Sequence, residues 1–249
     1  MKPTILVIGS GISGLYFALH AARFANVVVA TKEKAADSNT RLAQGGMAAV
    51  FADDDSFESH YLDTLRAGDG LCDEKSVKFL VKRAPEEIKS LERLGLKFDR
   101  KEGRLFLSRE AVHSRPRIVH IKDTTGESVE MFLLKKVKGN KNIRILEHHQ
   151  AVKLLQDKDK VTGALFLNNK THRAKIIYAD AVVLATGGLG RLFENTCNPE
   201  IATGDGFSLA YEAGAALQDM EFVQFHPTGL YGSKPVFLVS ETVRGEGGI

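Results

Sequence analysis

The chain has 249 residues, of which 43% are hydrophobic and 26% charged, enough for one large α/β domain or one and a half. Its formal net charge of +3 is small, and the basic residues are scattered along the chain. The densest basic run, residues 135–141, has no aromatic side chain that could stack on a base. We therefore interpret that run as a solvated face and predict no nucleic-acid partner. The two cysteines, Cys72 and Cys197, lie far apart and form no CxxC, which argues against a disulfide framework and against a zinc site, and we expect no bound metal.

Hydropathy argues against a membrane protein. No segment approaches the roughly 20 apolar residues of a transmembrane helix. The apolar start, residues 4–8, has no cleavage site and runs directly into a glycine turn, so it is not a signal peptide. We therefore predict a cytoplasmic protein with two reduced thiols and no membrane partner.

The first elements along the chain predict a βαβ unit. Residues 5–8 form a short apolar run typical of a buried strand, residues 13–23 have helical spacing, and residues 27–31 are a second strand. Such a unit favours a parallel sheet with a right-handed crossover. Residues 39–51 are rich in Gly and Ala and are expected to form a loop that enters a short apolar segment.

Two helices are predicted next, over residues 56–67 and 73–94. Asp73 is expected to open the second helix and Gly95 to end it. Pro85 lies inside this helix and is expected to kink or divide it, because proline removes a backbone donor and clashes with the preceding turn.

The second half of the chain is predicted to be rich in strands. An antiparallel meander is expected from four short runs, at residues 142–146, 151–156, 161–168 and 172–179. Residues 181–185 form a further apolar strand that ends in a Thr-Gly-Gly turn, and residues 203–216 have helical spacing.

A glycine pattern joins the first strand to the first helix. Residues 9–14 read Gly-Ser-Gly-Ile-Ser-Gly, a G-x-G-x-x-G in a strand–turn–helix setting. The first glycine permits a tight turn, the second lets the backbone approach a pyrophosphate, and the third allows close packing of helix on strand. The amino terminus of the helix then stabilises the anion. The pattern predicts a dinucleotide site, although glycine turns also occur for structural reasons alone.

The end of the second strand departs from the usual dinucleotide fingerprint. An acidic residue normally accepts hydrogen bonds from a ribose there, but this chain has Lys32, followed by Glu33. A lysine can donate to ribose oxygens or approach the phosphates, and the alternative is a solvated strand end. The substitution argues against an ordinary NAD site and favours a flavin nucleotide.

Further motifs carry a family resemblance. They are residues 39–46 (Asn-Thr-Arg-Leu-Ala-Gln-Gly-Gly), 185–188 (Ala-Thr-Gly-Gly), 203–206 (Thr-Gly-Asp-Gly), 221–229 (Glu-Phe-Val-Gln-Phe-His-Pro-Thr-Gly) and 241–247 (Glu-Thr-Val-Arg-Gly-Glu-Gly). In this order they resemble the family of L-aspartate oxidases and of the flavoprotein subunits of fumarate reductase and succinate dehydrogenase. The resemblance implies an α/β fold: a Rossmann-like FAD-binding domain with a parallel central sheet and an antiparallel β meander, plus the start of a capping domain.

Two features separate the members of this family. The respiratory enzymes attach FAD through a histidine just before the Thr of the Ala-Gln-Gly-Gly segment; this chain has Asn39 there, so the resemblance implies non-covalent FAD. Residues 108–120 (Ser-Arg-Glu-Ala-Val-His-Ser-Arg-Pro-Arg-Ile-Val-His) and 66–73 (Arg-Ala-Gly-Asp-Gly-Leu-Cys-Asp) are similar to the aspartate oxidases. A fumarate reductase or succinate dehydrogenase flavoprotein, and a non-catalytic flavin-binding fragment, are the alternatives.

The resemblance implies a set of cofactor-binding residues. Backbone donors of the glycine turn would bind the pyrophosphate, Lys32 would lie by the adenosine ribose, and residues 150–152 would pass the adenine. Residues 39–46 would surround the isoalloxazine ring. Asp205 would cap a helix, contact a ribityl hydroxyl, or do both. The expected cofactor contacts are Gly9, Ser10, Gly11, Ile12, Ser13, Gly14, Lys32, Asn39, Thr40, Arg41, Leu42, Ala43, Gln44, Gly45, Gly46, Ala151, Val152, Ala185, Thr186, Gly187 and Asp205.

The reaction implied is hydride transfer from Cα of L-aspartate to flavin N5. It gives iminoaspartate, and O2 or fumarate would then reoxidise the flavin. The reaction would be the first step towards quinolinate and NAD. An association with quinolinate synthase is therefore also considered. Glu110 is the candidate contact for the substrate ammonium, and this contact would distinguish an amino acid from a plain diacid. The alternative is a surface glutamate paired with Arg109 or Arg115.

Other residues are expected at the substrate. His226 would donate to a substrate carboxylate, with Gln224 and Ser240 nearby, and Glu241 and Arg244 would form a proton relay or, alternatively, an ordinary ion pair.

The chain ends in a glycine-rich turn at residues 245–249, which we interpret as the end of a truncated or excised piece of a longer protein. The family's acid/base arginine and the further substrate clamps would follow position 249, so a chain without them is expected to be inactive alone. The predicted division is an FAD-binding part, residues 1–220, and the start of a capping domain, residues 221–249.

Overall fold

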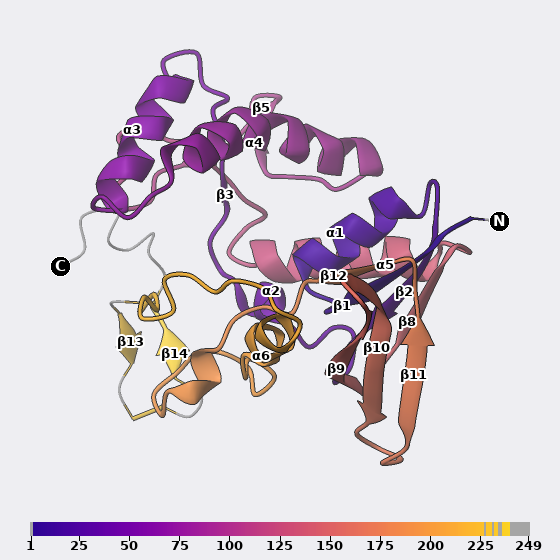
Figure 1. The fold of residues 1–249 in the computed structure, drawn as a ribbon. Helices are drawn as coiled ribbons and strands as arrows, with labels where there is room; N and C mark the ends of the chain where they lie inside the picture. Colours follow the sequence, from indigo (N-terminus) through magenta and orange to yellow (C-terminus); the bar gives the residue numbers. More distant parts are fainter. Residues whose placement is uncertain (1, 227, 231, 234–235, 240–249) are drawn as a thin grey trace. The chain divides into compact units, whose positions relative to one another are not determined.

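A computed structural model describes residues 2–226, 228–230, 232–233 and 236–239. The chain separates into two compact units (Figure 1). The first unit comprises Met1–Leu42 and Val129–Phe237, and the second comprises Ala43–Ser128 and Leu238–Ile249.

The first unit is built on a four-stranded parallel sheet. Its strand order is β12 (Ala181–Leu184), β1 (Thr4–Ile8), β2 (Asn26–Ala30) and β8 (Ile143–Leu146). The predicted βαβ unit is confirmed, because helix α1 (Ile12–Ala21) connects β1 to its parallel neighbour β2. The carboxyl ends of β1, β2 and β12 therefore meet at one edge of the sheet.

Strand periodicity divides the core of this unit between the two faces of the sheet. Ile5 and Val7 of β1 pack in one buried cluster with Ala18 of α1, whereas Leu6 and Ile8 pack in the other cluster. Figure 1 shows α1 on the first face and strands β9, β10 and β11 on the second. Both faces of β1 are thus covered, as is typical of a parallel strand that reads as a continuous apolar run.

The antiparallel meander has three strands, not the four predicted. They are β9 (His149–Asp157), β10 (Lys160–Asn168) and β11 (Ala174–Tyr178), with β10 in the middle. The prediction for residues 142–146 was wrong in its partner: β8 pairs in parallel with β2, in the central sheet. A crossover helix that the sequence patterns do not predict, α5 (Thr125–Lys138), precedes β8 along the chain.

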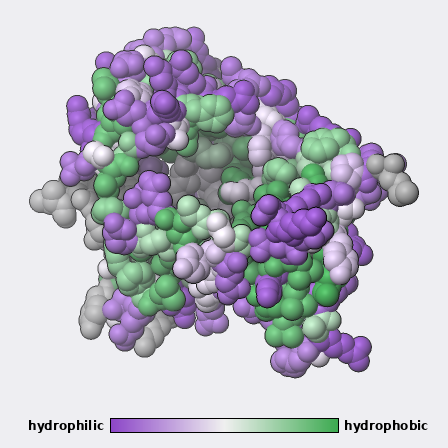
Figure 2. All heavy atoms as spheres, viewed as in Figure 1, coloured by the Kyte–Doolittle hydropathy of each residue, from purple (hydrophilic) through white to green (hydrophobic). Residues whose placement is uncertain are grey.

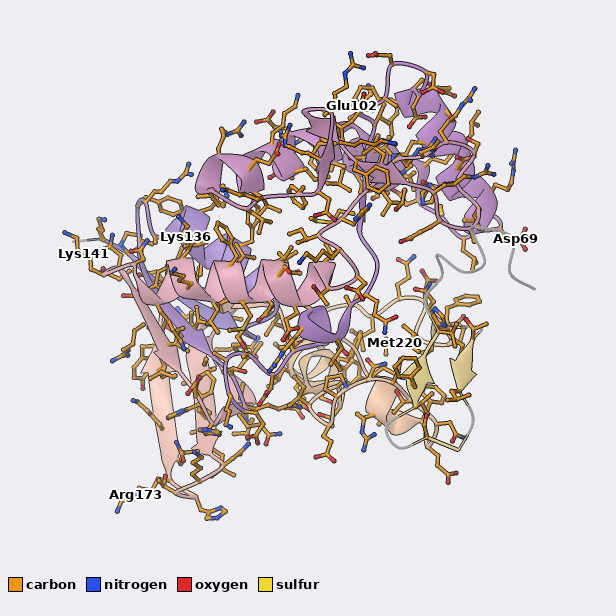
Figure 3. All side chains as sticks on the ribbon, turned by 180° about the vertical axis from the view of Figure 1, so that it is seen from behind. Asp69, Glu102, Lys136, Lys141, Arg173 and Met220 are labelled. Carbon is orange, nitrogen blue, oxygen red and sulfur yellow. The ribbon has the colours of Figure 1, made fainter. Side chains whose placement is uncertain are left out.

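Helix α5 carries the basic run at its carboxyl end. Lys135, Lys136 and Lys138 are exposed, whereas Val137 between them is fully buried. Lys136 and Lys141 extend outward in Figure 3. The interpretation of this run as a solvated face is confirmed, and the cations also lie where the negative end of the helix dipole favours them.

Smaller elements complete the first unit. The expected loop after residue 38 contains a short helix, α2 (Asn39–Leu42), and the helix expected at residues 203–216 is shorter, α6 (Asp205–Glu212). A 3-10 turn, η1 (Gly190–Leu192), and strand β13 (Gly229–Leu230) follow towards the carboxyl end, and strand β14 (Phe237–Leu238) lies at the boundary with the second unit.

The second unit contains the two predicted helices, α3 (Phe57–Ala67) and α4 (Glu74–Leu94). The side chain of Asp73 accepts a hydrogen bond from the Ser76 amide, and Gly95 ends α4 at φ 106°. Both limits of the helix are therefore those predicted. Pro85 is buried inside α4, which continues past it as one element, so the helix is not divided. Hydrophilic residues cover most of α3 and α4 in the view of Figure 2.

Short strands link the remaining segments of the second unit. Strand β7 (Ile118–Val119) pairs with both β3 (Met47–Ala48) and β6 (Leu107–Ser108), and β4 (Arg100–Lys101) pairs with β5 (Arg104–Leu105). None of these strands was predicted, because two-residue strands carry no periodicity. In the part of the chain that the structure describes, no helix combines the length and the apolar character needed to cross a membrane.

Candidate functional site

A cavity of about 400 Å³ opens at the carboxyl ends of the parallel strands of the first unit. This is the edge at which open α/β sheets bind ligands, and the volume is in the range of small-molecule and cofactor sites. The cavity is lined by six short stretches of chain: residues 8–13, 30–32, 37–40, 149 and 151, 184–187, and 201–209 in part.

The glycine turn shapes the floor of this cavity. Gly9 has φ 115°, and a Cβ there would lie 2.1 Å from the Ala185 carbonyl oxygen. A Cβ on Gly14 would lie 2.1 Å from the Gly9 carbonyl oxygen, so close packing of α1 on β1 requires glycine at both positions. Gly14 thus allows α1 to pack on β1, and it does not itself line the cavity.

The amino terminus of α1 faces this cavity with polar groups suited to an anion. Its N-cap, Gly11, supplies no side-chain cap, and the Ile12 amide donates to Thr40 Oγ1 at 3.0 Å. The hydroxyl of Ser10 is buried and makes no hydrogen bond within the described chain. A buried hydroxyl without a partner is costly, so this group fits a ligand oxygen that completes its hydrogen bonding.

Lys32 and Asp205 form the charged part of the cavity. Lys32 Nζ lies 2.9 Å from Asp205 Oδ2 and donates to Thr203 Oγ1 at 2.5 Å. Lys32 is therefore a paired, half-buried group, and the alternative of a solvated strand end is wrong. Burial opposes ionisation of Asp205, but hydrogen bonds from Thr203 and Lys32 outweigh it and keep the pKa of this carboxyl below its usual value.

The capping role considered for Asp205 is wrong. The N-cap of α6 is Gly204, at φ 77°, and the Asp205 carboxylate is directed at Lys32 and Thr203. Gln150 adds a weaker contact, with Nε2 3.4 Å from Asp205 Oδ2. The carboxylate is thus held at the cavity, where it can accept from a ligand hydroxyl.

Most of the predicted cofactor contacts come together in this cavity. The predicted residues that line it are Gly9, Ser10, Gly11, Ile12, Ser13, Lys32, Asn39, Thr40, Ala151, Ala185, Thr186, Gly187 and Asp205. Val152 does not line it and is 43% exposed, because its side chain follows the opposite parity to Ala151 in β9. Arg41 and Leu42 lie in α2 of the first unit, next to the lining residues.

Several lining residues were not predicted. They are Ile8, Ala30, Thr31, Asp37, Ser38, His149, Leu184, Ile201, Ala202 and Leu209. His149 could have been found from strand parity, since it lies two residues before Ala151 on the same face of β9. Ile201 and Ala202 carry no sequence signal, because only the fold brings them to the glycine turn.

The other predicted flavin contacts, Ala43, Gln44, Gly45 and Gly46, lie in the second unit. A Cβ on Gly46 would lie 2.3 Å from the Val119 carbonyl oxygen, so this backbone packs directly on β7. A Cβ on Gly45 would lie 3.0 Å from Glu110 Oε1. The candidate ammonium contact, Glu110, is therefore beside the glycine segment expected at the flavin ring.

The arginines considered as partners of Glu110 make other contacts. Arg109 Nε donates to the His113 carbonyl oxygen at 2.9 Å, and Arg115 Nη1 lies 3.4 Å from Asp54 Oδ2. Both arginines are exposed, so such contacts contribute little to stability.

The last predicted residues are only partly described. The Thr228 amide donates to His226 Nδ1 at 3.2 Å, which places the ring proton of neutral His226 on Nε2 and makes that atom the donor. Gln224 is exposed. Ser240, Glu241 and Arg244 lie outside the described residues, and their roles stay predictions.

Comparison with known proteins identifies the family. A family model described as "FAD binding domain" matches residues 4–249. The chain belongs to this FAD-binding family. Its fold class is the one predicted. The cavity, the amino terminus of α1 and the Ser10 hydroxyl, which has no hydrogen-bond partner among the described residues, suit a dinucleotide with a pyrophosphate.

Among curated relatives of this FAD-binding chain are L-aspartate oxidases. The chain is 43% identical to the chloroplastic enzyme of Arabidopsis thaliana, with 98% of the chain and 40% of the relative covered. It is 46% identical to the enzyme of Nostoc sp., with 98% and 42% covered. The chain thus spans less than half the length of the curated relatives named here.

Solved structures share the fold. Escherichia coli quinol fumarate reductase FrdA matches with a TM-score of 0.93 and 36% identity, over 100% of this chain and 43% of that one. Mycobacterium smegmatis Sdh1 matches with a TM-score of 0.89 and 35% identity, over 98% and 44%. Within the described residues, no group of three or more His, Cys, Asp or Glu side chains could hold a metal ion, and Cys72 and Cys197 are both free.

Proposed function

We propose that this chain is the FAD-binding part of an L-aspartate oxidase. The observation that carries the proposal is the position of Glu110 beside Gly45, in a chain whose curated relatives include L-aspartate oxidases at 41% to 46% identity. A carboxylate at the glycine segment would attract an ammonium group, and a plain four-carbon diacid offers it none.

The proposed chemistry divides between the cofactor and the chain. FAD, when bound, would supply a two-electron acceptor that takes the hydride from Cα of L-aspartate, leaving iminoaspartate after loss of an amine proton, and O2 or fumarate would remove the electrons. Glu110 would hold the substrate nitrogen, and Nε2 of His226 would donate to a substrate carboxylate. Orienting Cα in this way is the contribution expected of the protein.

The proposal extends to features of the whole protein. Residues 221–249 would begin a capping domain, and the acid/base arginine would follow position 249, so the 249-residue chain alone would turn over little aspartate. We place the protein in the cytoplasm, at the first step towards quinolinate and NAD, with quinolinate synthase as a candidate partner. Plant relatives are named as chloroplastic, which makes the compartment a separate question from the chemistry.

A fumarate reductase or succinate dehydrogenase flavoprotein is the second candidate, favoured by the similarity to FrdA. The two are separated by assaying the full-length protein. We expect peroxide formation from L-aspartate in air. Fumarate reduction by a dye donor, without any oxidation of aspartate, would instead establish the second candidate. A flavin spectrum absent after incubation with FAD would refute both.

Non-covalent attachment of FAD is a separate prediction. Asn39 lines the cavity and carries an amide, which lacks the nucleophilic ring nitrogen of the histidine used by the respiratory enzymes. After acid precipitation of the yellow protein, we expect all of the colour in the supernatant. Colour that stays in the pellet would mean a covalent bond and would contradict the argument from Asn39.

A further inference from the structure

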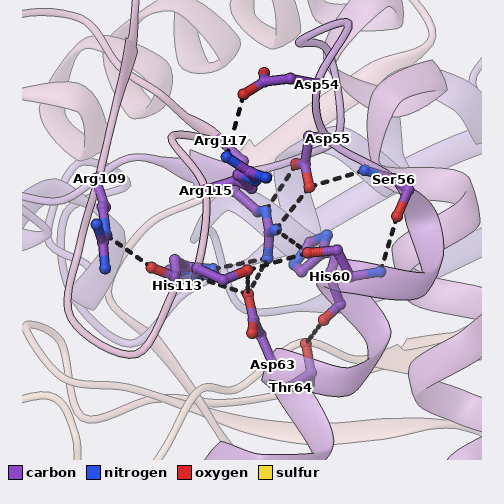
Figure 4. Close-up of polar contacts among 12 residues, drawn as sticks. Asp54, Asp55, Ser56, His60, Asp63, Thr64, Arg109, His113, Arg115 and Arg117 are labelled. Atoms are coloured by element: carbon purple, nitrogen blue, oxygen red, sulfur yellow. Dashed lines mark hydrogen bonds and ion pairs between the residues drawn. The ribbon is translucent and has the colours of Figure 1, made fainter.

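The second unit contains a buried ionic cluster formed by Arg117, Asp55 and Asp63 (Figure 4). Arg117 is fully buried; its Nη2 lies 2.7 Å from Asp55 Oδ1, and its Nη1 lies 2.7 Å from Asp63 Oδ2. Nε donates to Asp55 Oδ2 at 2.9 Å, and Nη2 also donates to Ser59 Oγ at 3.1 Å. Desolvation cancels much of the attraction in such clusters, so their net contribution to stability is small and the geometry they impose is the more informative property.

The backbone of Arg117 connects three segments of the unit. Its amide donates to the Ser108 carbonyl oxygen at 3.2 Å, and its carbonyl oxygen accepts from the Ala49 amide at 2.9 Å. Arg117 directly precedes β7, on which Gly46 packs. The residue that carries the buried guanidinium therefore also joins, through its backbone, β6, the segment that follows Gly46 and the end of the 109–116 loop.

The 109–116 loop, which carries Glu110, is attached to the same cluster. Asp63 Oδ2 accepts from the Ser114 amide at 2.8 Å and from the Ser114 hydroxyl at 2.7 Å. Within the loop Val112 has φ 73°, a left-handed conformation that is costly for a β-branched residue. Such strain persists only where surrounding contacts impose it, and it is concentrated at ligand sites.

The charges of the cluster are set by its neighbours. His113 Nδ1 lies 3.4 Å from Arg117 Nη1, and the His60 and His113 rings are 5.7 Å apart. Burial, and then the Arg117 charge, lower the pKa of both histidines, that of His60 to about 4, so both rings are neutral near pH 7. Burial opposes ionisation of Asp63, but the bonds from Ser114 and Arg117 outweigh it and lower its pKa.

We propose that the Arg117–Asp55–Asp63 cluster is a positioning device for Glu110. It anchors the 109–116 loop and the glycine segment to one point, so that the Glu110 carboxylate stays beside Gly45 and selects substrates that carry an amine. The inference rests on the proposed function, because it assigns the cluster to the specificity of that site. Its competitor is a cluster that contributes only to the folding of the second unit.

The test uses Asp63→Asn and the milder Ser114→Ala in the full-length protein. Asp63→Asn removes the charge that holds the loop and Arg117, and Ser114→Ala removes the hydroxyl bond to Asp63, while neither changes Glu110. We expect the KM for L-aspartate to rise about tenfold in Asp63→Asn and less in Ser114→Ala, with little change in kcat. The Kd of succinate, which has both carboxylates but no amine, should stay unchanged. Asp54→Asn is the matched control, because Asp54 makes an exposed contact to Arg115 in the same loop and should alter neither constant.

A double-mutant cycle with Glu110→Gln separates the possible failures. If Glu110 is positioned by the cluster, Asp63→Asn should add nothing to the aspartate KM of Glu110→Gln. Variants that unfold at lower temperature but keep the wild-type ratio of aspartate KM to succinate Kd would overturn the positioning role alone. A Glu110→Gln protein with normal aspartate kinetics would overturn the proposed function, and the positioning role with it. Should Asp63→Asn not fold, Ser114→Ala decides by the same ratio.

Discussion

Replacing Glu110 by glutamine should lower kcat/KM for L-aspartate by about 100-fold in the full-length protein. The substitution keeps the shape of the side chain and removes the negative charge that lies beside Gly45. A hydrogen bond to a charged partner contributes about 1.5–3 kcal/mol, and the upper part of that range corresponds to this change in rate. Steady-state peroxide formation at varied aspartate concentration measures it.

The same substitution should leave amine-free ligands unaffected. Binding of succinate, followed by its perturbation of the flavin spectrum, should be equal in Glu110→Gln and wild type. Glu102→Gln is the charge-matched control, because Glu102 lies on the exposed turn between β4 and β5 (Figure 3). An equal loss of aspartate and succinate binding in Glu110→Gln would indicate a general disturbance of the site and count against an ammonium contact.

Sequence patterns predicted the strands well and their partners less well. An apolar run such as β8 shows that a strand is buried, but it does not show which neighbour it has, since parallel and meander strands can have the same composition. The partner depends on the crossover. Helix α5 was missed although its buried Val129, Leu133, Leu134 and Val137 follow helical spacing, because Lys135, Lys136 and Lys138 were considered only as a basic run. A strand can join a parallel sheet only through a crossover connection, so without α5 a parallel position for β8 was not predicted.

In the candidate site, too, local features were predicted from the sequence, whereas contacts between distant residues were not. The glycine turn and the residues that follow β2 and β12 were predicted from local sequence patterns. Glycine is required in the turn because a side chain would not fit, as at Gly9, where a Cβ would collide with the Ala185 backbone. Arg117 was not singled out, because arginine is usually exposed and nothing nearby in sequence indicates burial. Its partners Asp55 and Asp63 are 62 and 54 residues away, so only the folded chain shows that three charges share one buried point.

Glu130 in α5 is a second buried charged group without a local sequence signal. Its side chain is fully buried, and neither carboxylate oxygen makes a well-formed hydrogen bond within the described chain. Burial raises its pKa from 4.5 to about 7, although the nearby Ser38 hydroxyl and Arg41 guanidinium favour the charged form. Below pH 4.5 the carboxyl is protonated in both the folded and the unfolded chain, so it imposes no pH-dependent cost there. As the pH rises towards 7 the unfolded chain releases the proton first, and stability is lost across that window.

Glu130→Gln should therefore raise the free energy of unfolding by about 3 kcal/mol at pH 8 and leave it unchanged near pH 4, because the amide is neutral at both. Urea unfolding of the 249-residue chain at the two pH values measures the difference. Glu212→Gln, at an exposed position in α6, should show neither effect. A gain of equal size at both pH values would mean that packing, rather than the charge of a buried carboxylate, separates Glu130→Gln from the wild type. No gain at pH 8 would mean that Ser38 and Arg41 fully compensate the negative charge of Glu130. Glu130 would then be an ionised partner of the cavity-lining segment, residues 37–40.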